Sequence, residues 1–402
     1  MALTPQQQAL QNKIDVLDSS ASTSTLLGLL VQSLDEGKII WSYDSSGQIP
    51  VDSDYHGMIH FTHDSDKIRF VGTSSKVHLL DSQDTAPPGV QAGQNVQGTA
   101  YGYMTAGFAA PSTYYNTIDK FSFTSNANAT DVGDTTSPGS VYEITASPTH
   151  TYIVGGYTSP GSNISSLEKY SMVSDGNSAD TGTPTPAERS ASTHNGPGFG
   201  YQIIASDIHK IVHTSDTFVD ASGTIPSPIE TSPAYKYQGY SSTTHAYSGN
   251  YNPTITNLDP FVKVAYASDT ATASSAKGDE TYGDQASAAN FNSDVAGYAA
   301  GGNTRPSTNA VTAMTKFVFA SEAEMTSVGT MAFAPAGQRD LGGCASTTYG
   351  YAAGGQSYTA PNSGATTQNT IHNTPFASDA NSSDVGDLTV ARRDITPNQS
   401  QV

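Results

Sequence analysis

GYAAGG at residues 297–302 recurs letter for letter as GYAAGG at residues 350–355, and looser copies lie upstream. Each copy carries one anchoring tyrosine. These tyrosines lie at positions 103, 152, 201, 247, 298 and 351, so successive copies are 49, 49, 46, 51 and 53 residues apart. A near-constant period of this length is typical of a repeat architecture. We therefore expect residues 86–402 to form one domain built from six copies.

Each copy follows one plan. The Tyr/Gly strand leads into a proline-containing loop, then a strand with apolar residues two positions apart, then a turn rich in Asp, Asn and Gly. A spacing of two places both apolar residues on one face of a strand. About fifty residues with room for four short strands correspond to one propeller blade. The sequence thus predicts a mainly β fold with a six-bladed β-propeller.

The end of the chain resembles the start of a repeat. LTVARR at residues 388–393 is similar to the lead-in PAER at 186–189 and to QR at 338–339, where the arginine precedes the next tyrosine by 12 residues. The first copy lacks this arginine in its own lead-in. We predict that the C-terminal segment completes the blade that begins near Tyr101, which would also hide the exposed sheet edges.

The region before the repeats is different in character. Residues 1–37 are expected to be helical, with a Thr-x-x-Gln capping box at residues 4–7 and two apolar faces. Such a segment suits attachment to another protein, or packing on the body of this chain. The candidate attachment residues are Leu10, Ile14, Leu17, Leu26, Leu30 and Leu34. Residues 38–85 are expected to form a small antiparallel β module or an extra blade, which would make seven blades.

Composition limits the partners. The chain has 36 acidic and 17 basic residues and a net charge of -19, which disfavours binding to nucleic acid or anionic lipid. The longest apolar run, residues 26–31, is too short to cross a bilayer. The N-terminus has no signal-like pattern, so a soluble protein made in a cytoplasm is expected.

The repeats resemble two groups of proteins. The glycine pair, the downstream aromatic strand and the period are similar to kelch-type propellers, although the late tryptophan of that family is missing. The fuller pattern, GYAAGG followed by KFVFAS and SDANSSDVGDLTVARR, looks more like repeats in virion proteins of tailed bacteriophages, notably phages of marine cyanobacteria. The helical opening and the module GMIHFTHDSDKIRFV also resemble attachment regions of phage fibre-like proteins. This resemblance implies a structural, tail- or fibre-associated virion protein.

The chain offers little sign of chemistry. A carboxylate-rich turn near the C-terminus has oxygen ligands of the type that calcium prefers, but its spacing departs from an EF-hand loop, and we favour a structural turn. The candidate metal ligands are Asp379, Asn381, Asp384 and Asp387. No spacing suited to zinc or to a catalytic nucleophile occurs, so no catalytic residue, no cofactor and no enzymatic activity are expected.

The proline loops carry a stronger signal for binding. They follow the Tyr/Gly strands at similar distances, so we expect them to gather on one face of the ring. Tyrosine with Asn, Ser and Thr can stack on sugar rings and bind hydroxyl groups, although ordinary solvated loops have a similar composition. The candidate ligand-binding residues are Tyr114, Tyr115, Tyr157, Tyr251, Asn303, Arg305 and Tyr358.

The leading hypothesis is a non-enzymatic component of a phage virion that assembles with other virion proteins, forms a homo-oligomer and presents its propeller to a host-surface glycan or protein. Two alternatives stay open. One is a carbohydrate-active enzyme on a propeller scaffold, which needs clustered acids or bases in the channel. The other is an intracellular kelch-like interaction scaffold, which leaves the N-terminal extension unexplained.

Overall fold

The computed structural model describes residues 41–43, 59–62, 67–71, 77–79, 96–158, 161–187, 192–204, 207–224, 239–249, 260–277, 285, 287–304, 309–332, 337–359 and 363–400. This part of the chain is mainly β, arranged in several small sheets that are almost entirely antiparallel. The chain divides into two compact units, Met1–Thr85 and Ala86–Val402.

The first unit contains one sheet with strand order β1-β2-β3-β4. Its strands are β1 (Trp41–Tyr43), β2 (Ile59–Thr62), β3 (Lys67–Val71) and β4 (Val77–Leu79). The sequence predicts strands at residues 39–43, 58–62, 68–71 and 77–80, which agree with these four, but the antiparallel prediction is wrong for β1 and β2, which pair in parallel. The physical reason is the long connection between them, since only a tight turn enforces an antiparallel hairpin. This sheet belongs to the first unit. The expected helical segment at residues 1–37, with its six leucine and isoleucine attachment residues, lies outside the described residues.

The second unit contains six larger sheets, which we number I to VI in chain order. Sheet I has the order β11-β10-β7-β6-β5-β33. Its strands are β5 (Tyr101–Ala109), β6 (Thr113–Ser122), β7 (Thr130–Ser140), β10 (Tyr157–Thr158), β11 (Ser162–Asn163) and β33 (Thr396–Ser400). Sheet II consists of β8 (Glu143–Ala146), β9 (His150–Val154), β12 (Ser166–Ser171) and β13 (Ala179–Pro184).

Sheets III to VI each have four antiparallel strands in chain order. Sheet III is β14 (Ser192–Gly196), β15 (Phe199–Ile204), β16 (Asp207–Val212) and β17 (Thr217–Thr224). Sheet IV is β18 (Gly239–Ser241), β19 (His245–Ser248), β20 (Pro260–Ala265) and β21 (Thr270–Lys277). Sheet V is β22 (Ala289–Asn292), β23 (Ala296–Ala300), β24 (Ala313–Val318) and β25 (Thr326–Thr330). Sheet VI is β27 (Gly342–Ala345), β28 (Tyr349–Ala353), β31 (Thr370–Pro375) and β32 (Ser383–Asp387).

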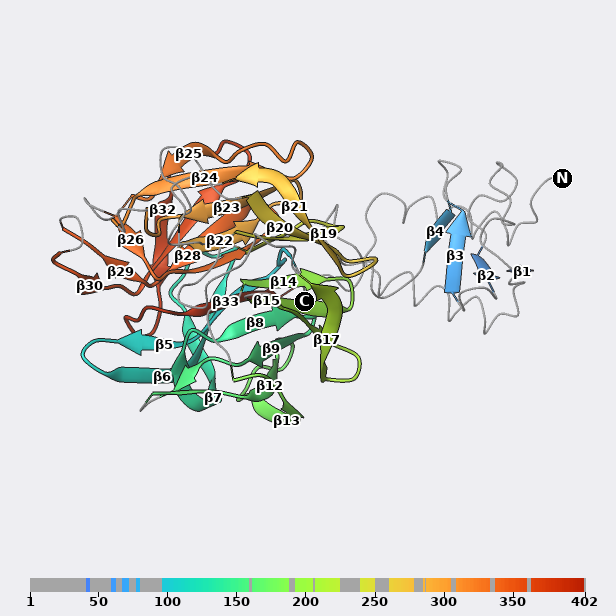
Figure 1. Ribbon diagram of the computed structural model, residues 1–402, viewed down its shortest axis with the longest axis horizontal. Coiled ribbons are helices and arrows are strands. Elements are labelled where there is room, and N and C mark those ends of the chain that lie inside the picture. The colour runs from blue at the N-terminus through green and yellow to red at the C-terminus, as the bar shows by residue number, and fades with distance from the viewer. Residues whose placement is uncertain are drawn as a thin grey trace, which may run out of the picture. The chain divides into compact units, whose positions relative to one another are not determined.

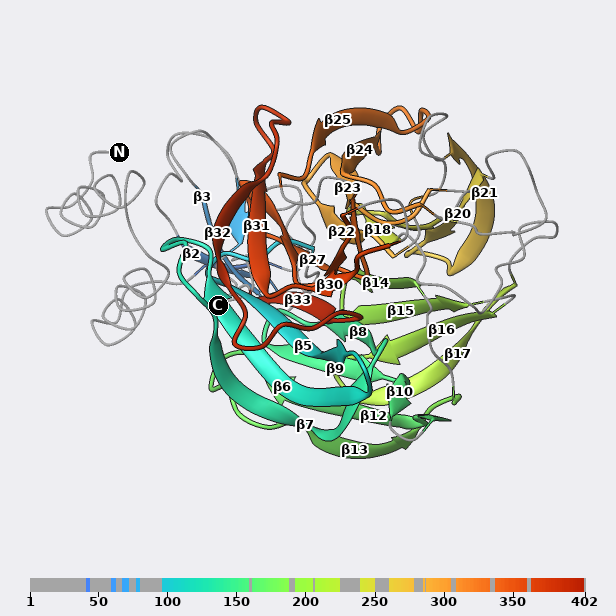
Figure 2. The same cartoon turned by 90° about the vertical axis from the view of Figure 1, so that its left-hand side faces the viewer.

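The first strands of these sheets meet one another at the centre of the unit. β8 contacts β14, β14 contacts β18, β18 contacts β22, β22 contacts β27, β27 contacts β33, and β33 contacts β8 again. Figure 2 shows these strands around a common centre, with the last strands such as β7, β13, β17 and β25 at the periphery. In sheets II to VI a short turn joins the first two strands at one end, which we call the turn face. The second and third strands are joined at the other end, the loop face (left in Figure 1).

The predicted role of the C-terminal segment is confirmed. β33 pairs with β5 in antiparallel register, with Ser400 opposite Tyr101 and Asn398 opposite Tyr103. Sheet I therefore takes its first strand from the end of the chain and the following strands from the start of the repeats, and β5 has a partner along both edges.

The anchoring tyrosines connect each sheet to the next. Tyr103 is fully buried, and its hydroxyl donates a 2.9 Å hydrogen bond to Asp175 in the following sheet, which also pairs with Lys120 beside the tyrosine at 2.8 Å. The same tyrosine, lysine and acid combination recurs four more times, in the order Tyr152, Lys169 and Asp216; Tyr201, Lys210 and Asp269; Tyr247, Lys263 and Glu322; Tyr298, Lys316 and Asp379. Each partly exposed ion pair contributes about 1 kcal/mol at most.

The interface between sheets VI and I differs from the other five. Tyr351 donates to the carbonyl of Phe123 at 3.3 Å, but Asn373 stands where the lysine is expected and Asn126 where the acid is expected. Asn126 has the same left-handed backbone, φ 46°, as Asp175 at 57°. The geometry of the connection is thus kept while its charges are absent. We call this interface the seam.

The opening motif is a strand, as predicted. GYAAGG at 297–302 supplies most of β23, and its glycine has a packing role: a Cβ on Gly297 would lie 2.4 Å from the ring of Tyr240 in the previous sheet. Gly301 and Gly302 then take φ values of 69° and 90°, which end the strand with a turn that other residues adopt poorly.

Candidate functional site

Sheet I is enlarged on the loop face. β5, β6 and β7 have 9, 10 and 11 residues, whereas the four strands of sheet V have 4 to 6. β10 and β11, which follow the second strand of sheet II in the chain, add to the edge of β7 instead. The β5–β6 hairpin extends to the side of the unit at which β29 and β30 lie (Figure 1). This extension is the largest departure from the repeat plan among the described residues.

Three aromatic rings cluster on this extension. Phe108 in β5 lies opposite Tyr114 in β6, with ring centroids 5.0 Å apart, and Tyr114 lies 6.2 Å from Tyr157 in β10. All three side chains are half-buried, as is Tyr115. A half-buried aromatic ring presents both an apolar face and an edge to solvent, which suits it to recognition.

Arg393 contacts this aromatic cluster and shares an acidic partner, Asp340, with Arg339. The guanidinium of Arg393 lies 5.0 Å from the ring of Phe108, and the two residues exchange backbone hydrogen bonds of 2.8 and 2.9 Å. Arg393 also pairs with Asp340 at 3.1 Å, and Arg339 lies 3.5 Å from the same carboxylate. Asp340 therefore balances the charges of Arg393, beside the aromatic cluster, and of Arg339. Arg339 belongs to a small sheet with the order β26-β29-β30. The strands of this sheet are β26 (Gln338–Arg339), β29 (Gln356–Ser357) and β30 (Thr366–Thr367).

The other predicted loop residues have varied positions. Tyr358 is 3% exposed and lies under Arg339, with the guanidinium 4.9 Å from its ring. Asn303 is 7% exposed and accepts a 3.3 Å hydrogen bond from Arg339. Tyr358 and Asn303 thus both contact the guanidinium of Arg339. Tyr251 and Arg305 lie outside the described residues. The structure therefore brings Tyr114 and Tyr157 together directly, and connects Asn303 and Tyr358 through an arginine.

The four candidate metal ligands are used within and between sheets. Asp379 pairs with Lys316 and Tyr298, Asn381 accepts from the backbone of Thr330 at 3.0 Å, and Asp384 accepts from the backbone of Gly386 at 3.2 Å. The backbone N–H of Asp387 donates to Asn128 in sheet I. Within the described ranges, no group of three or more His, Cys, Asp and Glu side chains is placed to hold a metal ion.

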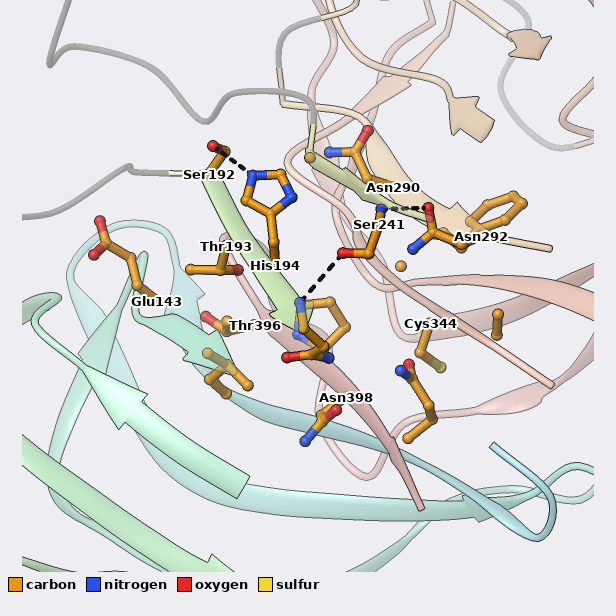
Figure 3. A pocket seen from close by; sticks show the side chains of 18 of the residues that line it. Glu143, Ser192, Thr193, His194, Ser241, Asn290, Asn292, Cys344, Thr396 and Asn398 are labelled. Carbon is orange, nitrogen blue, oxygen red and sulfur yellow. Dashed lines mark hydrogen bonds between the residues drawn. The ribbon is translucent and has the colours of Figure 1, made fainter. Parts of the chain in front are cut away.

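A cavity of about 140 Å³ lies where the six first strands meet (Figure 3). Polar side chains at its wall form hydrogen bonds from one sheet to the next. Asn195 accepts from the backbone of Ala146 at 2.8 Å, Ser241 accepts from the backbone of Asn195 at 3.2 Å, and Asn292 accepts from the backbone of Ser241 at 3.2 Å. These side chains act as links between first strands at equivalent positions.

The titratable groups at the cavity are buried and constrained. His194 lies 3.0 Å from the carbonyl of Tyr240 and 3.0 Å from the hydroxyl of Ser192, and burial lowers its pKa to about 4. Burial also raises the pKa of the Cys344 thiol, and Glu143 accepts a hydrogen bond from Gln202. An imidazole with a pKa of about 4 is a weak base at neutral pH, and an un-ionised thiol is a weak nucleophile.

Sequence reasoning missed Phe108, Arg339 and Arg393 as parts of the site. For Arg339 and Arg393 the sequence predicted only a place at the start of a repeat, and for Phe108 it predicted no role. Phe108 lies five residues after the tyrosine of its repeat, where the later copies have Tyr157, Ser206, Asn252, Asn303 and Gln356. An aromatic residue at this position in the first two copies alone was the available signal.

No protein-family model matches the chain, and no curated protein matches it at a significant level. A search of the described residues for helices long and apolar enough to cross a membrane finds none.

Proposed function

We propose that residues 86–402 form a six-bladed kelch-like β-propeller, and that the chain is a structural, non-enzymatic component of a tailed-phage virion. The observation that carries the proposal is the return of the first-strand contacts from β33 to β8, with the C-terminal strand seated in sheet I. In such a ring β5, with which the repeats begin, has a partner along both edges, as expected of a durable part of a particle. The phage-like repeats supply the link to a virion.

The polar groups of the repeat unit also favour a scaffold. Five tyrosine, lysine and acid connections join neighbouring sheets, and the cavity side chains link first strands. In this proposal residues 1–37 attach the chain to other virion proteins and promote a homo-oligomer, while the loop face of the propeller points outward. The protein is made in the host cytoplasm and resides in the virion.

A complementation experiment tests this proposal. A phage that lacks its own copy of the gene is grown on hosts that supply either the full chain or a chain without residues 1–37, and purified particles are probed with an antibody to the repeat unit. We expect the full chain in particles and the truncated chain, although folded, to be excluded. Equal incorporation of both would refute the attachment role, and absence of the full chain would refute the virion assignment.

A further inference from the structure

The enlarged part of sheet I carries a row of residues in register across five strands. Phe108 in β5 lies opposite Tyr114 in β6, and Tyr157 in β10 lies opposite both Ser140 in β7 and Asn163 in β11. Tyr115 lies opposite Gly139, which places Tyr114 beside Ser140. Because strands are about 4.8 Å apart, the row from β5 to β11 spans roughly 20 Å.

Two rings in this row, those of Tyr114 and Tyr157, approach each other across the small residue Ser140. Tyr114 and Tyr157 lie on strands separated by β7, and their centroids are 6.2 Å apart because only Ser140, which is 5% exposed, lies between them. Phe108 continues the row on the other side of Tyr114, and its far side is covered by Arg393. The result is a strip of three half-buried rings with an amide, Asn163, at its end.

This strip is not required by the repeat architecture. Sheets II to VI have four strands each, so the extra length of β5 to β7 and the addition of β10 and β11 are not part of the shared repeat plan. Sites for recognition are usually placed on such additions to a rigid scaffold. The strip is therefore a place at which recognition can differ from that of the other five sheets.

The charges near the strip determine which ligands fit it. The chain carries a net charge of -19, so polyanions are repelled at long range. The cation that touches the strip, Arg393, is balanced by Asp340 at 3.1 Å. A ligand that is uncharged, extended, apolar on one face and rich in hydroxyl groups fits these features, and a neutral oligosaccharide has this chemistry.

We propose that the row formed by Phe108, Tyr114, Tyr157 and Asn163 binds a neutral oligosaccharide that lies across the strands of sheet I. The rings pack against the C–H faces of successive sugars, and Asn163 bonds to hydroxyl groups at the end of the row. The biological role of this site, contact with a host-surface glycan, rests on the proposed virion function, but the binding itself does not.

The test uses the full chain on an array of neutral and uronate-containing oligosaccharides, followed by calorimetry with the strongest neutral hit. Tyr114→Ala and Tyr157→Ala should each weaken binding at least about tenfold, while Tyr114→Phe retains it because the ring remains. Tyr349→Ala is the matched control, since Tyr349 is a 36% exposed tyrosine on the turn face. It should bind like the unaltered chain, and circular dichroism should show that all variants are folded.

Three results would overturn the proposal: a folded chain that binds no neutral oligosaccharide on the array, binding that is stronger to uronates than to neutral sugars, or equal losses for Tyr349→Ala and Tyr114→Ala. The virion assignment is checked separately. Tyr114→Ala should still enter particles. An unaltered chain that enters particles but binds no neutral oligosaccharide defeats only this inference, and sugar binding by a chain absent from particles defeats only the proposed function.

Discussion

Arg392 and Asp119 form an ion pair of 3.1 Å in which neither side chain is exposed to solvent. Arg392 belongs to the C-terminal segment and Asp119 to β6, so the pair fixes the chain end in sheet I. Asp119 also accepts two hydrogen bonds from Thr389, from its backbone at 3.0 Å and its hydroxyl at 2.6 Å. In sheet V the corresponding partners are neutral, because Thr315 donates to Gln285. Sheet I, whose first strand comes from the end of the chain, thus has a charged pair where sheet V has a neutral one.

Removing one charge of this pair should be costly. Arg392→Gln leaves a buried carboxylate without its cation, and we expect it to lower the free energy of unfolding by roughly 3–5 kcal/mol. The double variant Arg392→Gln with Asp119→Thr recreates the neutral pair of sheet V and should recover most of this loss. Urea unfolding followed by circular dichroism measures both. Trp41, the single tryptophan, lies in the first unit, so its fluorescence provides an internal control. A double variant as unstable as the single one would contradict this account.

The seam can be given the missing charges. Asn126→Asp with Asn373→Lys should create a sixth tyrosine, lysine and acid connection, because Asn126 already has the backbone conformation of Asp175. We expect the pair to raise the free energy of unfolding by about 1 kcal/mol more than the sum of the single changes. A double-mutant cycle in urea measures this coupling. Additive effects would show that the two positions do not meet across the seam.

Acid should destabilise the repeat unit through buried histidine. The folded pKa of His194 is about 4, below the unfolded value of about 6.5, so the unfolded chain binds the proton more strongly. Its contribution to stability is thus present above pH 6.5 and is lost as the pH falls toward 4, by up to about 3 kcal/mol. His194→Gln should flatten the dependence of the urea midpoint on pH between 6.5 and 4.5. An unchanged pH dependence in that variant would show that His194 does not cause the loss of stability in acid.

Deleting residues 396–402 should expose the edge of β5 in sheet I. Without β33 the edge of β5 is unpaired, and exposed edges of this kind promote association between chains. We expect larger species in size-exclusion chromatography and faster amide exchange in residues 101–105. A synthetic peptide of residues 388–402 should restore the elution profile of the chain without the deletion. Slow exchange in the truncated chain would mean that β33 contributes nothing to the edge.

The sequence predicted the repeating parts well because repetition reveals which residues share a structural role. The anchoring tyrosines, the strand at 297–300 and the seating of the C-terminal segment in sheet I all follow from comparing copies. The acid of each connection, such as Asp175, was not predicted as a partner of Tyr103 because it belongs to the next repeat. The spacing of residues within one repeat does not reveal which residues contact each other between neighbouring repeats.

The candidate site was only partly predictable for a related reason. Tyr114 and Tyr157 were chosen for their place in the proline loops, and the structure brings their rings together. Tyr358 and Asn303 share that place in the chain but lie beneath Arg339, which no pattern in their own loops indicates. Asn163 was missed because it meets Tyr157 only through the pairing of β10 with β11. Registers between strands from different repeats require the structure.

The most direct test of the central claim is quantitative mass spectrometry of tailed particles purified from the culture that expresses this chain. The account predicts that peptides from both units occur in the particle fraction in a constant ratio to known tail proteins and resist washing at high salt. Recovery of the chain only in the soluble fraction, with particles that lack it, would contradict the account.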